Sequence, residues 1–245
     1  MTTFLIGIDD TDNETSPGTG RLARRLLAEC ARRGLNPLGV TRHQFLVDPA
    51  IAYTSHNSGA CIAVESEDGL KNRDFMYDFV ARSRADGSDP GVCIANASDV
   101  PDFVVEFADR ATRRVVTMIE AFDRARQASI ALCGLGGTCL GVIGALGSVG
   151  LRASGKNGRF IDLPGLRELS GCVNAEAFDR IGVRLEHCHC QRAPGSNDRY
   201  ETLEWVRPRL TGGEAVLPVQ WSAIKDAWIP VDRKGHASGR DNPRP

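Results

Sequence analysis

Short apolar runs alternate with helix-like segments over the first 127 residues, and this alternation limits the fold more than any other feature. Residues 3–8 read as a buried strand that stops at a polar, turn-rich run. Apolar residues at helical spacing then predict a helix over 20–33. Further strands are expected at 38–47, 59–66 and 91–96, and helices at 70–85 and 101–127. This order of elements predicts an α/β (α+β) fold.

Two regions of the chain have their own element pattern. Residues 37–127 have the strand and helix order of a small ferredoxin-like α/β sandwich. The C-terminal region is β-rich, with an expected strand pair at 159–163 and 181–190. Short β runs follow the loop after residue 190, and we expect Trp205 and Trp221 to anchor their packing. The final residues are expected to be disordered.

Composition excludes several classes of protein. The 245 residues are 42% hydrophobic and 25% charged, which is typical of a folded chain. Thirty basic residues face 31 acidic ones, and this balance argues against a mainly non-specific nucleic-acid binder. No stretch reads as a signal peptide or a membrane span, so we expect a cytoplasmic protein whose eight cysteines are reduced.

Three aspartates, Asp9, Asp10 and Asp12, follow the first expected strand. Ligands of α/β proteins collect where strands end, so a site is plausible here. Carboxylates this close repel one another, and Mg²⁺ would make the arrangement favourable, with Thr11 and Asn13 as neutral oxygen donors. The alternative is a solvated acidic turn at the positive end of the next helix.

A glycine-rich, uncharged segment spans residues 134–151. Its glycines could let backbone N–H groups approach a phosphate, with a helix starting near Thr138. It has no Gly-Lys-Ser/Thr ending and is not a Walker loop. The alternative is a helix of small residues packed tightly against a neighbour.

Two further clusters leave the choice between a site and a solvated surface open. His187, Cys188, His189 and Cys190 could bind zinc, but a strand would place the two residue types on opposite faces, so an ordinary strand is favoured. Arginines that open the 20–33 helix, together with a lysine further on, could recognise phosphate or simply be solvated. These basic residues are Arg21, Arg24, Arg25 and Lys156.

Four sequence patches occur in an order that resembles one family. They are IGIDDTD at 6–12, DPAIAYTSHNSGA at 48–60, SDPGVCIA at 88–95 and GVIGALGSVG at 141–150. Together they resemble the archaeal agmatinylcytidine synthetases, which modify the wobble cytidine of an isoleucine tRNA. The patches cover about the first 155 residues.

The resemblance implies a domain order. A kinase-like domain would comprise residues 1–36 and 128–190, with the ferredoxin-like unit, 37–127, inserted between them. A β extension and tail, 191–245, would end the chain. In that family ATP and Mg²⁺ activate the cytidine carbonyl, and agmatine then displaces the phosphate.

The resemblance also implies site residues. Asp9, Asp10 and Asp12 would be catalytic and would hold Mg²⁺ and the ATP phosphates. The residues expected to line the nucleotide site are Thr11, Gly18, Thr19, Arg21, Gly141, Gly144 and Lys156.

Three departures from the family weaken the tRNA interpretation. The family continues into an oligonucleotide-binding fold and a zinc ribbon, whereas this chain has at most a short β-rich part after residue 190. Near the family's phosphate-accepting threonine this chain has Arg21, with only Thr19 close by. A basic run before the glycine-rich helix is replaced here by neutral residues.

The leading hypothesis is an Mg²⁺-dependent, ATP-using phosphoryl-transfer enzyme of the kinase or ligase kind. Its acceptor would be a tRNA cytidine or a small metabolite, with no membrane partner. A homo-oligomer or a partner subunit could replace the missing domains. The competing hypothesis is a non-catalytic nucleotide- or RNA-binding module that kept the fold.

Overall fold

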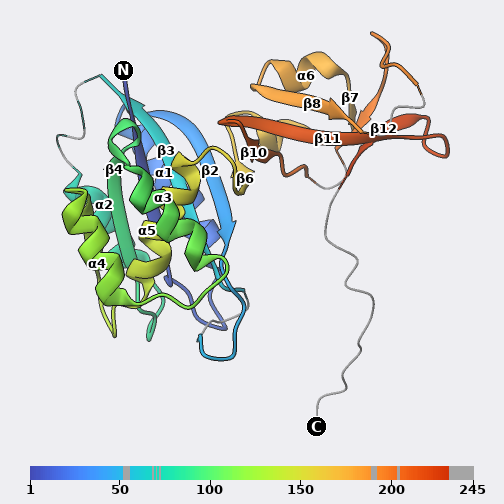
Figure 1. The fold of residues 1–245 in the computed structure, drawn as a ribbon. Coiled ribbons are helices and arrows are strands. Elements are labelled where there is room, and N and C mark those ends of the chain that lie inside the picture. Colours follow the sequence, from blue (N-terminus) through green and yellow to red (C-terminus); the bar gives the residue numbers. More distant parts are fainter. Residues whose placement is uncertain are drawn as a thin grey trace.

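Strands and helices alternate through the first 153 residues much as the hydrophobic pattern predicts (Figure 1). The computed structural model describes residues 1–51, 56–67, 69, 71, 73–188, 192–202 and 205–231. The helices are α1 (Thr19–Arg32), α2 (Asp74–Ser83), α3 (Asp102–Ala111), α4 (Met118–Gln127), α5 (Gly141–Ala153) and α6 (Ala175–Asp179). The first six strands are β1 (Thr2–Asp9), β2 (Asn36–Gln44), β3 (Ser58–Ser66), β4 (Gly91–Asn96), β5 (Ala131–Gly134) and β6 (Arg159–Asp162). The remaining strands are β7 (Cys172–Val173), β8 (Val183–His187), β9 (Tyr200–Glu201), β10 (Arg209–Thr211), β11 (Glu214–Ser222) and β12 (Ala227–Pro230).

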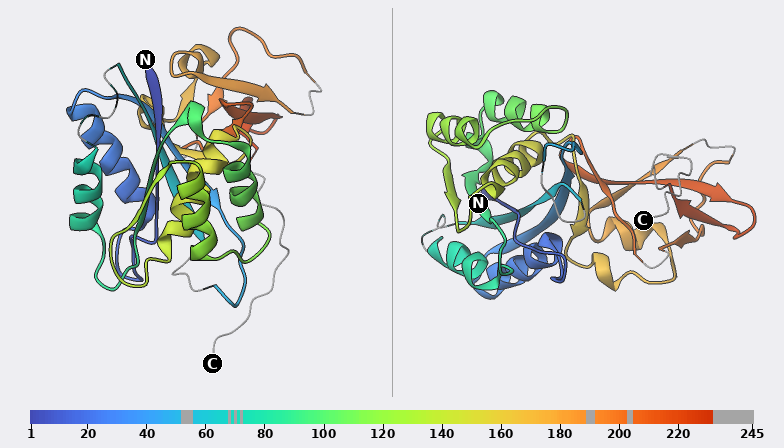
Figure 2. Two further views of the ribbon diagram at one scale, coloured as in Figure 1. Left: turned by 60° about the vertical axis from the view of Figure 1, so that its left-hand side comes forward. Right: turned by 90° about the horizontal axis from the view of Figure 1, so that it is seen from below.

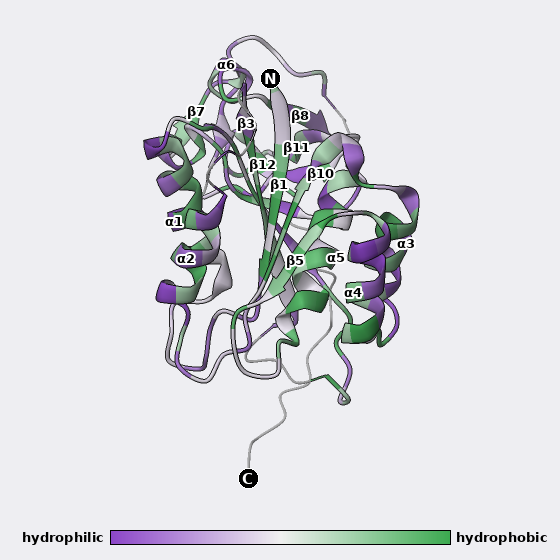
Figure 3. Cartoon of the chain, turned by 90° about the vertical axis from the view of Figure 1, so that its left-hand side faces the viewer, coloured by the Kyte–Doolittle hydropathy of each residue, from purple (hydrophilic) through white to green (hydrophobic). Residues whose placement is uncertain are grey.

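The first six strands form an antiparallel sheet between two layers of helices, in the order β5-β4-β1-β3-β2-β6. Helices α1 and α2 cover one face, and α3, α4 and α5 cover the other (Figures 2 and 3). Strands from the expected kinase-like and ferredoxin-like segments therefore belong to one continuous sheet. The mixed α/β fold is confirmed, and the division into domains stays a prediction.

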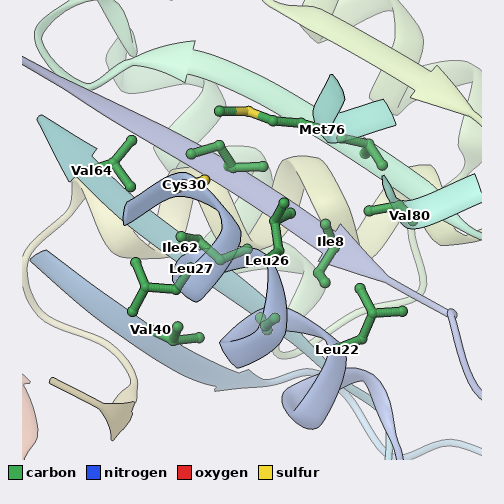
Figure 4. Packing of buried hydrophobic residues seen from close by; sticks show 14 of the residues in the cluster. Ile8, Leu22, Leu26, Leu27, Cys30, Val40, Ile62, Val64, Met76 and Val80 are labelled. Carbon is green, nitrogen blue, oxygen red and sulfur yellow. The ribbon is translucent and has the colours of Figure 1, made fainter. Parts of the chain in front are cut away.

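The apolar stripe of α1 packs on the first face of this sheet. Leu22 and Leu26 lie against Ile8 of β1 and Ile62 of β3, whose side chains share the face of the sheet that α1 covers (Figure 4). The period of two in the strands and of about 3.6 in the helix brings these side chains together. Their burial fixes where β1 ends relative to the start of α1.

On the opposite face, glycines let the backbone of α5 approach the strands closely. A Cβ on Gly7 would overlap the carbonyl oxygen of Ala145, and one on Gly91 would overlap the backbone of Gly141. Helix α5 therefore lies with its backbone almost against β1 and β4. The structure thus supports the tight-packing interpretation of the glycine-rich segment, and the helix begins at Gly141 rather than near Thr138.

A second unit is built from the β-rich C-terminal region. Strand β6 pairs with both β2 and β10, so the sheet continues from one unit into the other (Figure 1). The C-terminal unit has a separate core, which includes Phe178, Tyr200 and the fully buried Trp228. Trp228 donates through Nε1 to Asp198 over 2.8 Å, which satisfies the one polar group of its ring.

Several sequence-based expectations are wrong in detail. The helix expected over 101–127 is two helices, because Thr117 caps α4 by accepting a hydrogen bond from the Glu120 backbone (3.2 Å). The strands β6 and β8 do not pair with each other; β8 pairs with β11. Trp221 does pack against the core of the C-terminal unit, as expected, whereas Trp205 packs against the core under α1, and the fully buried tryptophan is Trp228.

Two observations complete the description of the chain. No helix in the described ranges is long and apolar enough to cross a membrane. The tail expected to be disordered falls almost wholly beyond residue 231, outside the described residues.

The close approach of α5 to β1 predicts that Gly7→Ala is severely destabilising. The new methyl group would meet backbone atoms, which cannot rotate away. We expect a loss of about 3 kcal/mol or more in the free energy of unfolding, measured by urea denaturation. Gly20→Ala is the control, because its Cβ would meet only the end of the Ile161 side chain, at 3.1 Å. Equal stability of the two variants would contradict this packing.

A buried histidine predicts how stability changes with pH. Burial, together with the charge of Arg152, lowers the pKa of His43 to about 3, although a hydrogen bond to Asn157 acts in the other direction. The folded state therefore disfavours protonation, and stability is lost as the pH falls from about 6.5 toward 3. Between pH 7 and 5 the wild type should lose about 2 kcal/mol more than His43→Gln. Parallel pH dependences of the two proteins would refute this assignment.

Candidate functional site

The acidic loop is fixed to the start of α1 by a chain of side-chain hydrogen bonds. Thr11 donates from Oγ1 to Oγ1 of Thr19 over 2.9 Å, and Thr19 donates to Oδ1 of Asp12 over 2.9 Å. Both threonines are buried. The loop between β1 and α1 is therefore ordered by its own polar residues, with Asp10 in the left-handed region at a φ of 53°.

The carboxylates of this loop are electrostatically unfavourable together. Burial raises the pKa of Asp9 to about 7, and the charges of Asp10 and Asp12 add to the effect. Burial also raises the pKa of Asp10, helped by the charges of Asp89 and Asp12. Three carboxyl groups are thus crowded at the end of β1, and a bound cation would favour their charged forms.

Helix α5 fixes one wall of this region. A Cβ on Gly144 would overlap the Asp9 carboxylate, and one on Gly141 would lie 2.8 Å from the Asp9 carbonyl oxygen. Just before the helix, Thr138 donates from its backbone to Asp89 over 2.8 Å and also from its hydroxyl group. These contacts place the carboxylates against the first turn of α5.

An apolar cavity of about 370 Å³ opens beside the three aspartates. Its walls come from α5, from the segment after β2 and from the connection between α3 and α4. The apolar residues in the lining are Phe45, Ala50, Ile51, Ala111, Val115, Val116, Met118, Leu140 and Ile143. An acidic floor with apolar walls suits a ring system attached to a cation-bound group.

A basic cavity of about 440 Å³ adjoins the apolar one. The two share Asp12, His56 and Ser58 in their linings. The N-terminal turn of α1, residues 18–20, forms one side of the basic cavity. The arginines that line it are Arg21, Arg24, Arg42, Arg167 and Arg207, with Trp205 among them. Such a lining is suited to phosphate or carboxylate groups.

The structure brings most of the predicted site residues together. The three aspartates, Gly141 and Gly144 line the apolar cavity, whereas Gly18, Thr19 and Arg21 line the basic one. Thr11 lines neither cavity and holds the loop in place through its hydrogen bond to Thr19. Lys156 lies beyond the other end of α5 and lines neither of these cavities.

Sequence reasoning missed several residues of this region. The sequence pattern marks Asp89 only as part of a strand entry and Arg42 only as part of a strand. Arg167, Trp205 and Arg207 come from the C-terminal unit, and their distance along the chain hides their convergence. The strand-flanking position of Asp89, just before β4, is a signal that could have identified it.

The donor set fits Mg²⁺ carried by a nucleotide better than a dedicated metal cage. Within the described part of the chain, no group of three or more His, Cys, Asp or Glu side chains is placed to hold a metal. Mg²⁺, however, usually takes one or two carboxylates, with phosphate and water oxygens completing its shell. The carboxyl groups of Asp9, Asp10 and Asp12, close together at the end of β1, could supply the one or two protein ligands.

The other proposed metal cluster gains no support from the residues that can be described. His187 ends β8 and lies 2.9 Å from the hydroxyl group of Tyr200 through Nε2, beside the buried Trp228. Cys188 carries a free thiol. His189 and Cys190 lie outside the described residues.

No protein-family model matches the sequence, and no curated protein matches it either. The chain does match solved structures. The chain is similar to a structure of TiaS in complex with its isoleucine tRNA and ATP, with 27% identity and a TM-score of 0.53 over 61% of this chain and 36% of that one. It is similar to a tRNA fluorescent labeling enzyme, with 28% identity and a TM-score of 0.52 over 60% and 36%. Apo TiaS, a tRNA agmatidine synthetase, matches with 25% identity and a TM-score of 0.50 over 60% and 35%.

The chain therefore spans about a third of the length of the structures it matches. The similarity covers about three-fifths of this chain. The resemblance expected from the four sequence patches is thus confirmed: this chain resembles part of the agmatidine synthetase TiaS in its fold.

Proposed function

We propose that this protein is an Mg²⁺-dependent enzyme that uses ATP to phosphorylate an acceptor. One observation carries the proposal: the acidic end of β1 lies where an apolar and a basic cavity meet, sharing Asp12, His56 and Ser58. The similarity to TiaS structures bound to ATP, and to AMPCPP with agmatine, supports nucleotide use. Donor and acceptor would meet at this shared edge.

The apolar cavity would take the nucleoside part of ATP. Phe45, Ile51 and Met118 offer apolar surface to the base, while the aspartates face the phosphate end. Asp9, Asp10 and Asp12 would hold Mg²⁺, which when bound neutralises phosphate charge during transfer. Gly141 and Gly144 would act through Asp9, because the absence of a Cβ at either position lets Asp9 lie against the first turn of α5 at the cavity wall.

The reaction is a displacement at phosphorus. An acceptor oxygen attacks the γ-phosphorus while the bond to the β–γ bridging oxygen breaks. ADP leaves with that oxygen, and the phosphate stays on the acceptor. Arg21 and Arg42 of the basic cavity would stabilise the negative charge of the transferred group. The residues of both cavities mainly position the reactants, as phosphoryl transfer demands.

The acceptor would be a cytidine of tRNA or a small metabolite. TiaS acts on tRNA, as the names of its solved structures state. The similarity covers 36% of that chain. A second copy or a partner subunit would supply further contacts to a tRNA acceptor.

A non-catalytic nucleotide-binding module is the second candidate. It is favoured by the state of Thr19, whose hydroxyl is buried and bonded to Asp12 rather than open to a phosphate. Calorimetry that detects MgATP binding, with no turnover for any acceptor tested, would support it. Turnover would exclude it.

The proposed metal site predicts the effect of Asp9→Asn. The change keeps the shape of the side chain but removes its charge, so the fold should persist. We expect Mg²⁺-dependent ATP turnover to fall by about 100-fold or more, measured with and without Mg²⁺. Asp78→Asn, on the exposed face of α2, is the control and should retain turnover. Equal turnover by wild type and Asp9→Asn would remove the proposed role of Asp9.

A further inference from the structure

Five arginines from three separate parts of the chain converge on the basic cavity. Helix α1 contributes Arg21 and Arg24, and β2 contributes Arg42. The C-terminal unit contributes Arg167 and Arg207. Asp12 is the one acidic residue among the lining residues that the structure describes. The chain as a whole carries a net charge of only −1, so the positive charge here is a local concentration.

Three of these guanidinium groups are held in place by contacts with neighbouring residues. Arg42 donates from Nε to Oγ of Ser58 over 2.9 Å. Arg167 donates to the Ile161 carbonyl oxygen over 3.0 Å and lies 4.7 Å from the centre of the Trp205 ring. Arg207 lies 3.9 Å from the centre of the same ring. Trp205 therefore holds two arginines of the C-terminal unit beside the cavity by cation–π contact.

The arrangement leaves positive charge crowded against positive charge. The pKa of Arg24 is lowered first by burial and then by the charges of Arg167 and Arg21, although Asp162 opposes this. The N-terminal turn of α1 adds its partial positive charge to the same cavity. An anion would relieve this repulsion, and the planar guanidinium groups match the oxygens of phosphate.

We propose that the basic cavity binds a phosphate group of the acceptor, and that the C-terminal unit completes this site with Arg167, Trp205 and Arg207. The role of this ligand as the acceptor rests on the proposed function, whereas the phosphate site itself does not. The phosphate is a phosphodiester of RNA or a phosphomonoester of a small molecule. Either source presents negatively charged, non-bridging phosphate oxygens to the arginines.

The donor nucleotide has a separate place. The carboxylates lie in the apolar cavity, where Mg²⁺ and the ATP phosphates would sit, and only Asp12 of the three reaches the basic cavity. The five arginines lie in the other cavity, where Asp162 is 3.9 Å from one of them, Arg167. Their gathering away from Asp9 and Asp10 favours a second anionic ligand beside MgATP.

The experiment compares ligands on the full chain by calorimetry. The probes are inorganic phosphate, cytidine 5′-monophosphate, cytidine without phosphate, a single-stranded cytidine oligonucleotide and MgATP. The test variant is Arg167→Gln/Arg207→Gln, which changes two exposed side chains of the C-terminal unit. The matched control is Arg113→Gln/Arg126→Gln, which removes the same charge from exposed surface ion pairs outside both cavities.

We expect the wild type and the control to bind the monophosphate at least tenfold more tightly than cytidine. The test variant should lose about 30-fold in monophosphate affinity while keeping its MgATP affinity within twofold. If RNA is the source, the oligonucleotide binds more tightly than the monophosphate, with a steep salt dependence. If a small molecule is the source, the two bind alike.

Three results would overturn the proposal. One is that no phosphate probe binds the wild type, and another is that the test variant and the control bind these probes equally. The third is a matching loss of MgATP affinity in the test variant, which would assign the cavity to the ATP phosphates. Failure of MgATP to bind the wild type, with arginine-dependent monophosphate binding intact, would refute the proposed function and leave the phosphate site standing.

Discussion

The contact of helix α5 with the central strands determines the geometry of the site. Gly7 and Gly91 in the strands and Gly141 in the helix allow backbone to meet backbone. Gly144 leaves room for the Asp9 carboxylate. That approach places the first turn of α5 against the end of β1, where Asp9 lies. The wall of the apolar cavity and the position of the buried carboxylate are thus consequences of one packing constraint.

Local patterns predicted the parts of the fold that local physics controls. The stripe of Leu22, Leu26 and Cys30 predicted α1 because a helix buries residues at that spacing. Asp9, Asp10 and Asp12 were identified because a strand end is a common place for ligands, and the structure does set them beside a cavity. In both cases a few neighbouring residues carry the whole signal.

Features that depend on distant residues could not be predicted this way. The basic cavity joins Arg42 to Arg167 and Arg207, and only the pairing of β6 with β2 and β10 brings them near one another. The break between α3 and α4 is hard to predict because Val115 and Val116 continue the apolar pattern across it. The cap at Thr117 that begins α4 is a single polar residue. Tertiary pairing and capping outweighed periodicity at these places.

Under the proposed function, donor and acceptor occupy two adjoining cavities that meet at Asp12, His56 and Ser58. A crystal structure of the protein with Mg²⁺ and a non-hydrolysable ATP analogue would test this arrangement. We expect the base among Phe45 and Met118, with the γ-phosphate at the shared edge. A triphosphate lying wholly among the arginines, with Asp9 and Asp10 remote from any cation, would contradict it.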